Sequence, residues 1–289
     1  MSNLARAITA DGSAVALALN STELVSRIEQ IHTTSAVTTA ALGRLATGAG
    51  LMGAMLKGER DSLTLRMQGD GPAGILLAVA DSAGHVKAYV ENPVVEIPLN
   101  KLGKLDVAGA VGTNGTLSVV KDLGMKEPYC SQVPITSGEV AEDITYYYAT
   151  SEQTPTVCGL GVLVNPDLTV CSAGGFLVQL LPFADEACID LIEENLKDLP
   201  PVSELFRTGM TPEQVCMRLL QGMEPNLLDE SEVRYFCDCS RERVARALMS
   251  LGNEDLQELI EDERPTQVEC HFCNQTYTFS KQELKNFLK

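Results

Sequence analysis

Apolar and polar residues in the first 180 positions follow a pattern that predicts a mixed α+β domain. Leu24, Ile28 and Ile31 recur along one helical face, directly after a polar start at Ser21. A second helix is expected from Ser35 to about Lys57, and its many small residues would allow close packing.

Runs of apolar and β-branched residues predict strands that alternate with turn sequences. Turns are expected at 69–72, 81–84 and 165–167, and the sequence Thr-Asn-Gly-Thr at 113–116 predicts a further hairpin turn. The strands should pair into an antiparallel sheet covered by the N-terminal helices. The predicted strands lie at 62–67, 75–80, 86–90, 157–164 and 168–172.

The composition changes near Pro182. Residues 181–232 contain twelve Asp or Glu and three Lys or Arg, with helical patterns at 184–196 and a capping box that starts at Thr211. Because large apolar residues are few and the acidic residues repel one another, this segment is expected to be a weakly stable helical linker. An acidic surface on a well-packed domain would give the same pattern.

The last segment, 233–289, carries consistent helix signals but few apolar residues. Ser240 can cap a helix that ends at Gly252, a short helix is expected at 254–260, and a capping box starts the final helix at Ser280. Such a small segment requires a staple to fold. The predicted organisation is an α+β core domain at 1–180, an acidic helical linker at 181–232 and a small C-terminal domain at 233–289.

Four cysteines in the C-terminal segment fall into two tight pairs, Cys237-Asp238-Cys239 and Cys270-His271-Phe272-Cys273. Four converging thiolates suit a closed tetrahedral zinc site, so Cys237, Cys239, Cys270 and Cys273 are the candidate ligands of one Zn²⁺ per chain. The same sulfurs can instead close two local disulfides. Zinc-bound thiolates lie roughly 3.8 Å apart, whereas a disulfide needs about 2.05 Å, so the two states exclude each other.

The remaining cysteines and histidines do not extend this cluster. His271 is expected on the surface or beside the ligands, although it can replace one of them. His32 and His85 lie in unrelated settings, so no Cys–His or Ser–His pair is indicated, and no nucleotide-binding loop follows a strand. Nothing points to catalysis. Five further cysteines are expected to be small buried residues: Cys130, Cys158, Cys171, Cys188 and Cys216.

Charge and composition restrict the partners and the compartment. A formal net charge of −17 argues against a nucleic-acid-binding surface. The N-terminus has no basic region followed by an apolar run, and the apolar stretch 40–56 is shorter than a membrane span. Nine cysteines without the spacing of a secreted scaffold favour a reducing cytoplasm.

With these residues in view, the chain resembles the 33-kDa heat-shock proteins, the redox-regulated chaperones of bacteria. The two cysteine pairs carry the resemblance most specifically. Ala41-Leu42-Gly43-Arg44, Gly69-Asp70-Gly71-Pro72 and the stretch 173–179 (AGGFLVQ) support it in the same order along the chain.

The resemblance implies an ATP-independent holdase with a C-terminal zinc-binding redox switch. The reduced, zinc-bound form would be inactive. Oxidation would form the disulfides Cys237–Cys239 and Cys270–Cys273, release zinc and unfold the linker. The oxidised protein would form a homodimer, bind unfolding client proteins and prevent their aggregation during oxidative and heat stress.

Two other functions are compatible with the residues alone. The first is an inert interaction module stapled by zinc, with the acidity weighing against nucleic acid as its partner. The second is a thiol–disulfide oxidoreductase that uses Cys270 and Cys273, although these lack the preceding strand and following helix of a thioredoxin-like unit.

Overall fold

A computed structural model describes residues 2–182, 184–262 and 264–288. The chain divides into two compact units, Met1–Phe236 and Cys237–Lys289. Among the described residues, no helix has the length and apolar character that crossing a membrane requires.

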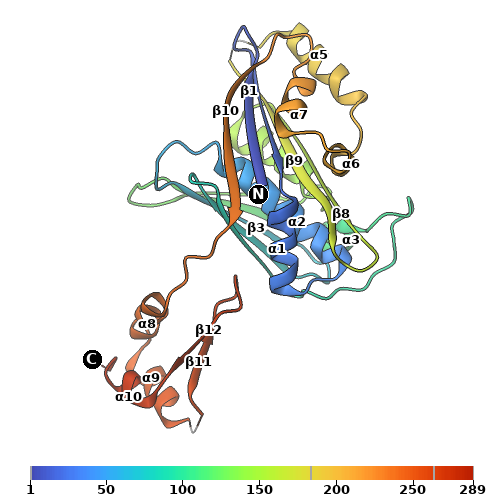
Figure 1. Cartoon of the computed structure of the whole chain (residues 1–289). Helices are drawn as coiled ribbons and strands as arrows, with labels where there is room; N and C mark the ends of the chain where they lie inside the picture. The colour runs from blue at the N-terminus through green and yellow to red at the C-terminus, as the bar shows by residue number, and fades with distance from the viewer. Residues whose placement is uncertain (1, 183, 263, 289) are drawn as a thin grey trace. The chain divides into compact units, whose positions relative to one another are not determined.

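The first unit is built on a ten-stranded sheet (Figure 1). Its strand order is β7-β6-β3-β4-β5-β10-β1-β2-β9-β8, and neighbours are antiparallel except β10 and β5, which are parallel. The mixed α+β class and the largely antiparallel sheet are as predicted. The strands are β1 (Ser2–Ile8), β2 (Ala14–Asn20), β3 (Ser62–Gln68), β4 (Ile75–Asp81), β5 (His85–Val90), β6 (Thr116–Asp122), β7 (Tyr129–Pro134), β8 (Thr156–Val164), β9 (Val170–Leu180) and β10 (Asn226–Tyr235).

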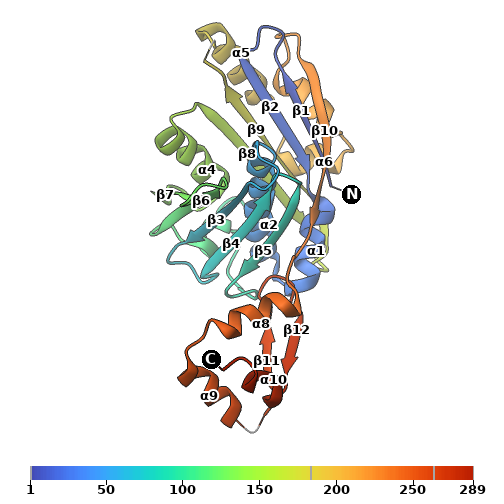
Figure 2. The same cartoon turned by 90° about the vertical axis from the view of Figure 1, so that its left-hand side faces the viewer.

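Helices cover both faces of part of this sheet. The helix α2 contacts strands from both halves of the sheet, so the sheet curves around it (Figure 2). On the opposite face, α6 packs on β8 and β9, and α7 packs on β1 and β2. The helices are α1 (Thr22–His32), α2 (Ala36–Gly53), α3 (Val107–Val111), α4 (Ala141–Tyr147), α5 (Glu186–Lys197), α6 (Val202–Arg207) and α7 (Pro212–Leu219), with a π-helical turn at Tyr148–Glu152 after α4.

The strand β2 shows why two cores form. Leu17 and Leu19 join the main core with α1 and α2, whereas Ala14, Ala16 and Ala18 join a second core with α5, α6 and α7. Successive side chains of a strand point to opposite faces, so β2 presents leucines to one core and alanines to the other. The small alanine side chains let α7 approach the sheet closely.

Residues 181–232 contain more packed structure than the helical pattern predicts. The helices α5 to α7 are present, and Ile192, Phe206 and Val215 are buried in the second core. The segment then continues into β10, a strand inside the sheet, which the helical expectation missed. The acidic side chains of this segment mostly face solvent, whereas its apolar side chains pack in the second core. The net charge of a segment therefore does not show whether the segment is packed.

The prediction of a hairpin turn at 113–116 is wrong. A helix, α3, ends at Val111 directly before it, and β6 begins at Thr116. This segment is therefore a helix-to-strand connection. The turns at 69–72 and 81–84 do join antiparallel neighbours, and the predicted hairpin that joins β8 to β9 is also present.

The second unit combines three short helices with a two-stranded sheet. Its core consists of Leu248, Ile260, Phe279 and Leu284. Leu256 is buried as well. Five buried apolar side chains form a small core for a folded unit, which agrees with the expectation that the segment requires a staple. Its elements are α8 (Arg241–Met249), α9 (Asn253–Glu261), β11 (Thr266–Glu269), β12 (Thr276–Phe279) and α10 (Lys281–Lys285).

Candidate metal centre

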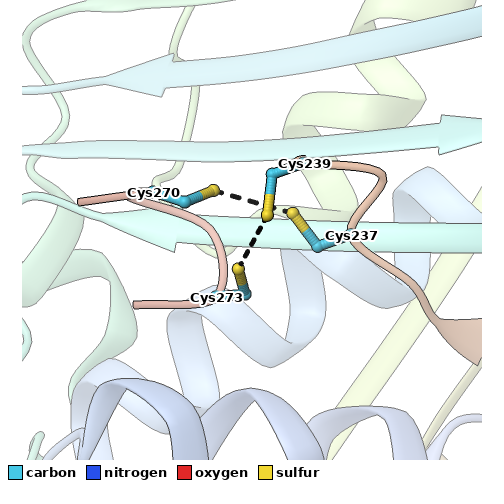
Figure 3. Close-up of side chains that lie close together, drawn as sticks. All are labelled: Cys237, Cys239, Cys270 and Cys273. Atoms are coloured by element: carbon cyan, nitrogen blue, oxygen red, sulfur yellow. Dashed lines mark hydrogen bonds between the residues drawn. The ribbon is translucent and has the colours of Figure 1, made fainter. Parts of the chain in front are cut away.

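Four sulfur atoms converge in the second unit (Figure 3). The Sγ atoms of Cys237, Cys239, Cys270 and Cys273 all lie within 4.8 Å of one another. Cys237 Sγ is 3.7 Å from Cys270 Sγ, and Cys239 Sγ is 3.3 Å from Cys273 Sγ. Both short contacts join one cysteine pair to the other, so the cluster connects two segments that lie about thirty residues apart.

The backbone around Cys270 forms a tight turn that directs two sulfurs inward. The carbonyl of Cys270 accepts hydrogen bonds from the amides of Cys273, at 3.2 Å, and Asn274, at 2.8 Å. Asn274 has a φ of 56°, a left-handed conformation that asparagine tolerates better than most residues. The hairpin of β11 and β12 continues from this turn, so its pairing fixes the positions of both thiols.

The first cysteine pair lies just before α8, whose N-terminus is firmly held. Ser240 caps the helix by accepting a hydrogen bond from the amide of Arg243. Arg241 donates to the carbonyl of Thr278 at 2.8 Å and to the Glu283 carboxylate at 2.6 Å, and its guanidinium lies 4.4 Å from the centre of the Phe279 ring. Arg241 thus holds the segment that carries Cys239 against β12 and α10.

Hydrogen bonds within the cluster divide the thiols by acidity. Burial raises the pKa of Cys239, but hydrogen bonds from Tyr277, at 3.1 Å, and from Cys273 outweigh it and lower the pKa below the usual range. Burial raises the pKa of Cys237, and it raises the pKa of Cys273 to about 11. The bond to Cys239 raises the pKa of Tyr277 to about 12. Cys239 is therefore the thiol that Tyr277 stabilises as a thiolate.

The donor set and spacing fit a tetrahedral thiolate site. Zinc–sulfur bonds of about 2.3 Å place sulfurs roughly 3.8 Å apart, close to the two sulfur–sulfur contacts here. Among the described residues, these cysteines are the one group of Cys, His, Asp or Glu side chains close enough together to hold a metal ion. Four soft sulfur ligands favour zinc over hard cations such as Mg²⁺.

The neighbouring residues show what the sequence found and what it missed. His271 is exposed, which agrees with the expectation of a surface position. Tyr277 was not predicted to support the site, because only the β11–β12 hairpin brings it to Cys239. Arg241 lies two residues after Cys239, but its partners Thr278 and Glu283 are distant in sequence.

The strand β11 ends directly before Cys270, so the expectation that no strand precedes this pair is wrong. As expected, no helix follows directly: Cys270 and Cys273 lie in a turn that leads into β12, unlike the helix N-terminus that activates thioredoxin-like cysteines.

The five other cysteines do not share one environment. Cys158, Cys188 and Cys216 are buried, as predicted. Cys130 is exposed and Cys171 is half-buried, so the prediction of burial is wrong for Cys130 and too strong for Cys171. Cys130 lies on β7, an edge strand whose side chains mostly face solvent, a feature that an isolated sequence of six residues does not reveal.

Comparison with known proteins assigns the chain to a family. The family model described as Hsp33 protein matches residues 2–280. The chain belongs to the Hsp33 family. Two relatives, each named 33 kDa chaperonin, are 48% identical to it: one from Bacillus licheniformis over 99% of this chain and 98% of its own length, and one from Lachnoclostridium phytofermentans over 98% and 97%.

A solved structure of the Hsp33 family has the same fold. The crystal structure of the 33 kDa chaperonin, a heat shock protein 33 homologue, from Thermotoga maritima superposes with a TM-score of 0.91 and 39% identity. The match covers 99% of this chain and 97% of that one. Membership of the Hsp33 family supports a chaperone role, and the four-cysteine cluster is compatible with a metal site and a redox switch.

Proposed function

We propose that the protein is a redox-regulated, ATP-independent holdase chaperone of the cytoplasm and has no enzymatic activity. In the reduced state Cys237, Cys239, Cys270 and Cys273 would hold one Zn²⁺ and the chaperone would be inactive. The convergence of the four sulfurs within 4.8 Å supports this proposal, because the same atoms can serve either as metal ligands or as disulfide partners. Membership of the Hsp33 family supports the chaperone activity.

Oxidation would convert the cluster into the disulfides Cys237–Cys239 and Cys270–Cys273. For each disulfide, two thiolates give two electrons to one hydrogen peroxide, which takes up two protons from solvent and is reduced to two waters. The two sulfur atoms of each pair, which lie within 4.8 Å of each other, must approach to about 2.05 Å, and every thiolate ligand is consumed. The oxidised cluster therefore has no thiolate left to hold zinc.

Loss of the metal would unfold the second unit. Structural zinc contributes roughly 10–16 kcal/mol of apparent binding free energy in small domains. About fifty residues provide only about 3–8 kcal/mol of stability on ordinary per-residue values. The small core of the second unit agrees with this balance. Zinc therefore supplies the structural staple, and its loss leaves the unit without enough buried surface.

Unfolding that spread into residues 181–232 would uncover an apolar surface. Val215 and Leu219 of α7 now cover the alanine face of β1 and β2, and Phe206 of α6 lies against β9. A holdase needs an apolar surface, but a permanently exposed one promotes aggregation. Coupling exposure to oxidation would limit this risk to oxidative and heat stress, when unfolding clients are abundant, and binding them would hold them apart by mass action.

The charge of the protein fits these partners. The formal net charge of −17 argues against nucleic acid and would keep the opened form in solution. We infer that the oxidised form is a homodimer that binds unfolding proteins, and that it acts without a membrane partner.

Zinc release and chaperone activity, followed together, test the proposal. The reduced protein is treated with peroxide at mild heat while released zinc and the light scattering of an aggregating client are recorded. Coincident zinc loss and suppression of scattering, both reversed by a reductant, are expected. Zinc loss without suppression would instead leave an inert zinc-stapled module, and turnover of a small disulfide substrate would favour an oxidoreductase.

A further inference from the structure

The strand β10 is unusual among the strands inside the sheet. It lies between β5 and β1 and joins the two halves of the sheet. Yet of its ten residues, all of which the structure describes, Val233 alone is buried. Leu227 and Leu228 are 38% and 52% exposed. An inner strand normally buries alternate side chains on at least one face, so β10 is held mainly through its backbone.

The backbone contacts of β10 are extensive on one side and few on the other. It pairs with β1 along the whole length of that strand, from Ser2 to Ile8. Towards β5 it forms two register pairs, and the amides of Arg234 and Phe236 donate to the carbonyls of Gly84, at 2.8 Å, and Val86, at 2.9 Å. A Cβ added at Gly84 would lie 2.2 Å from the Glu232 carbonyl oxygen, so main chain approaches main chain directly there.

Few side chains of β10 add to this hold. Val233 contributes to the main core. Its Cγ1 lies so close to Gly50 of α2 that a Cβ added at Gly50 would be 3.3 Å from it. Arg234 lies 3.0 Å from His85 Nε2, and Asp229 lies 3.7 Å from Arg6 Nε, both at exposed or half-exposed positions. Tyr235 is half-buried and also packs against the main core. The site of β10 thus requires an extended chain with two apolar side chains at alternate positions and little else.

The neighbours of β10 are anchored independently of it. β1 also pairs with β2, and its Leu4 and Ala5 are buried in the two different cores. β5 also pairs with β4. Both strands would therefore remain in place if β10 left, and the slot between them would present unpaired amides and carbonyls. β10 ends at Tyr235, two residues before Cys237, so the redox cluster is joined to its end by a very short stretch of chain.

We propose that oxidation frees β10 and that the slot between β1 and β5 then binds an extended segment of an unfolding client through backbone hydrogen bonds. This inference rests on the proposed holdase function and specifies how clients are recognised. Strand addition gives affinity through the main chain, which all polypeptides share. A slot that requires only two apolar side chains, at the positions of Val233 and Tyr235, suits unfolded chains of unrelated sequence, which a holdase must accept.

A synthetic peptide with the sequence of residues 226–235 provides the first test. The oxidised protein is bound to fluorescently labelled, reduced and carboxymethylated α-lactalbumin, a permanently unfolded chain, and the peptide is added as a competitor. We expect the peptide to displace the client and a version N-methylated at alternate residues to lose this ability. Equal competition by both peptides, or by neither, would overturn backbone recognition.

A disulfide lock provides the second test. Asn3 and Glu232 are exposed and directly opposite in the β1–β10 register, so Asn3→Cys with Glu232→Cys can tie β10 in place before zinc is released. The locked protein should release zinc on oxidation but lose suppression of aggregation. A matched lock within the pair β3–β6, Thr64→Cys with Val120→Cys, should leave suppression intact.

The outcomes separate this inference from the function on which it rests. If the wild type releases zinc without suppressing aggregation, the holdase function itself fails. If the wild type and the β10-locked protein both suppress aggregation, the slot is refuted while the holdase function stands. Hydrogen exchange of β1 amides gives a direct reading, since they should exchange faster on oxidation and slow again with the client. If exchange of the β1 amides instead slows in the absence of client, and does so more at higher protein concentration, a second copy of the chain fills the slot. That result would refute the proposal that the slot binds clients.

Discussion

At the scale of single residues, the four-cysteine cluster depends on each of its members. A tetrahedral site that loses one thiolate keeps three ligands and binds zinc less tightly. Cys270 carries a further role, because its carbonyl accepts the two amide hydrogen bonds that shape the turn, and this role survives a side-chain substitution. Substitutions of the sulfur alone therefore test metal binding without removing the turn.

Replacing a ligand should weaken zinc binding and uncouple activity from oxidation. We expect Cys237→Ser or Cys270→Ser to lower zinc affinity by at least about 10–100-fold. A loss of that size follows the removal of a residue that only hydrogen-bonds to a metal ligand, and the removal of a ligand itself should cost at least as much. Zinc content after purification measures this. Cys130→Ser, at an exposed thiol of the first unit, is the matched control and should retain full zinc. Unchanged zinc in both ligand variants would contradict the assignment.

A second residue-scale feature is the ion pair at the π-helical turn. Lys121 Nζ lies 2.8 Å from Glu152 Oε1, and the hydroxyl of the buried Tyr147 donates to the same carboxylate. We expect Lys121→Met to cost about 1–3 kcal/mol, because it leaves a partly buried carboxylate with one donor fewer. Urea unfolding measures the loss. The double variant Lys121→Met with Glu152→Gln should lose less free energy of unfolding than the sum of the losses of the two single variants.

The same carboxylate gives a pH dependence. Burial raises the pKa of Glu152, but the hydrogen bonds from Lys121 and Tyr147 outweigh it and lower the pKa below the usual value of 4.5. Because the folded state favours the ionised form, its stabilisation is present above about pH 4.5 and is lost as the pH falls below it. The stability difference between the wild type and Glu152→Gln should therefore shrink on acidification. A difference that grew instead would reverse the sign of the pKa shift.

At the scale of elements, helix ends show where local sequence suffices and where it does not. Ser240, Thr211 and Ser280 cap their helices with their own side chains, as their sequences predict. Ser21 and Ser35 precede helices without such a bond. Their hydroxyls instead contact Thr47 and the carbonyl of Val95, partners that are distant in sequence. Tertiary hydrogen bonds replace the local cap in the densely packed α1 and α2.

The capping box of α7 can be tested directly. Thr211 accepts from the amide of Gln214, and Gln214 accepts from the amide of Thr211 at 3.0 Å. Thr211→Ala should cost about 1 kcal/mol in the free energy of unfolding, a typical value for a lost N-cap. Thr211→Ser keeps the hydroxyl and should retain most of it. Equal losses in both variants, measured by urea unfolding, would show that the methyl contact rather than the cap matters.

At the scale of the whole molecule, the two units differ greatly in how they are stabilised. The first has two extensive cores, whereas the described residues of the second include five buried apolar side chains and the four-cysteine cluster. Removal of zinc by a chelator, with the thiols kept reduced, should unfold residues 237–289 and leave β1 to β9 folded. Limited proteolysis should then cut within 237–289 first. Cleavage that began in the first unit would contradict this order.

Much of this protein was set by local sequence. The cysteine pairs, the helix caps and the β3–β4, β4–β5 and β8–β9 hairpins depend on residues that are close along the chain, so short-range chemistry is enough to predict them. The grouping of the four thiols was also predictable, because few other roles explain two tight pairs about thirty residues apart.

Only the tertiary structure decided the parts that depend on distant contacts. β2 lies between two cores, so its residues are apolar on both faces and show no polar alternation that would mark a strand. β10 carries acidic side chains because its place in the sheet is fixed by backbone pairing with β1, which contributes no side-chain pattern. Tyr277 reaches Cys239 only because β12 folds back on the turn. Local sequence thus determines which atoms can react, and long-range pairing determines what covers and surrounds them.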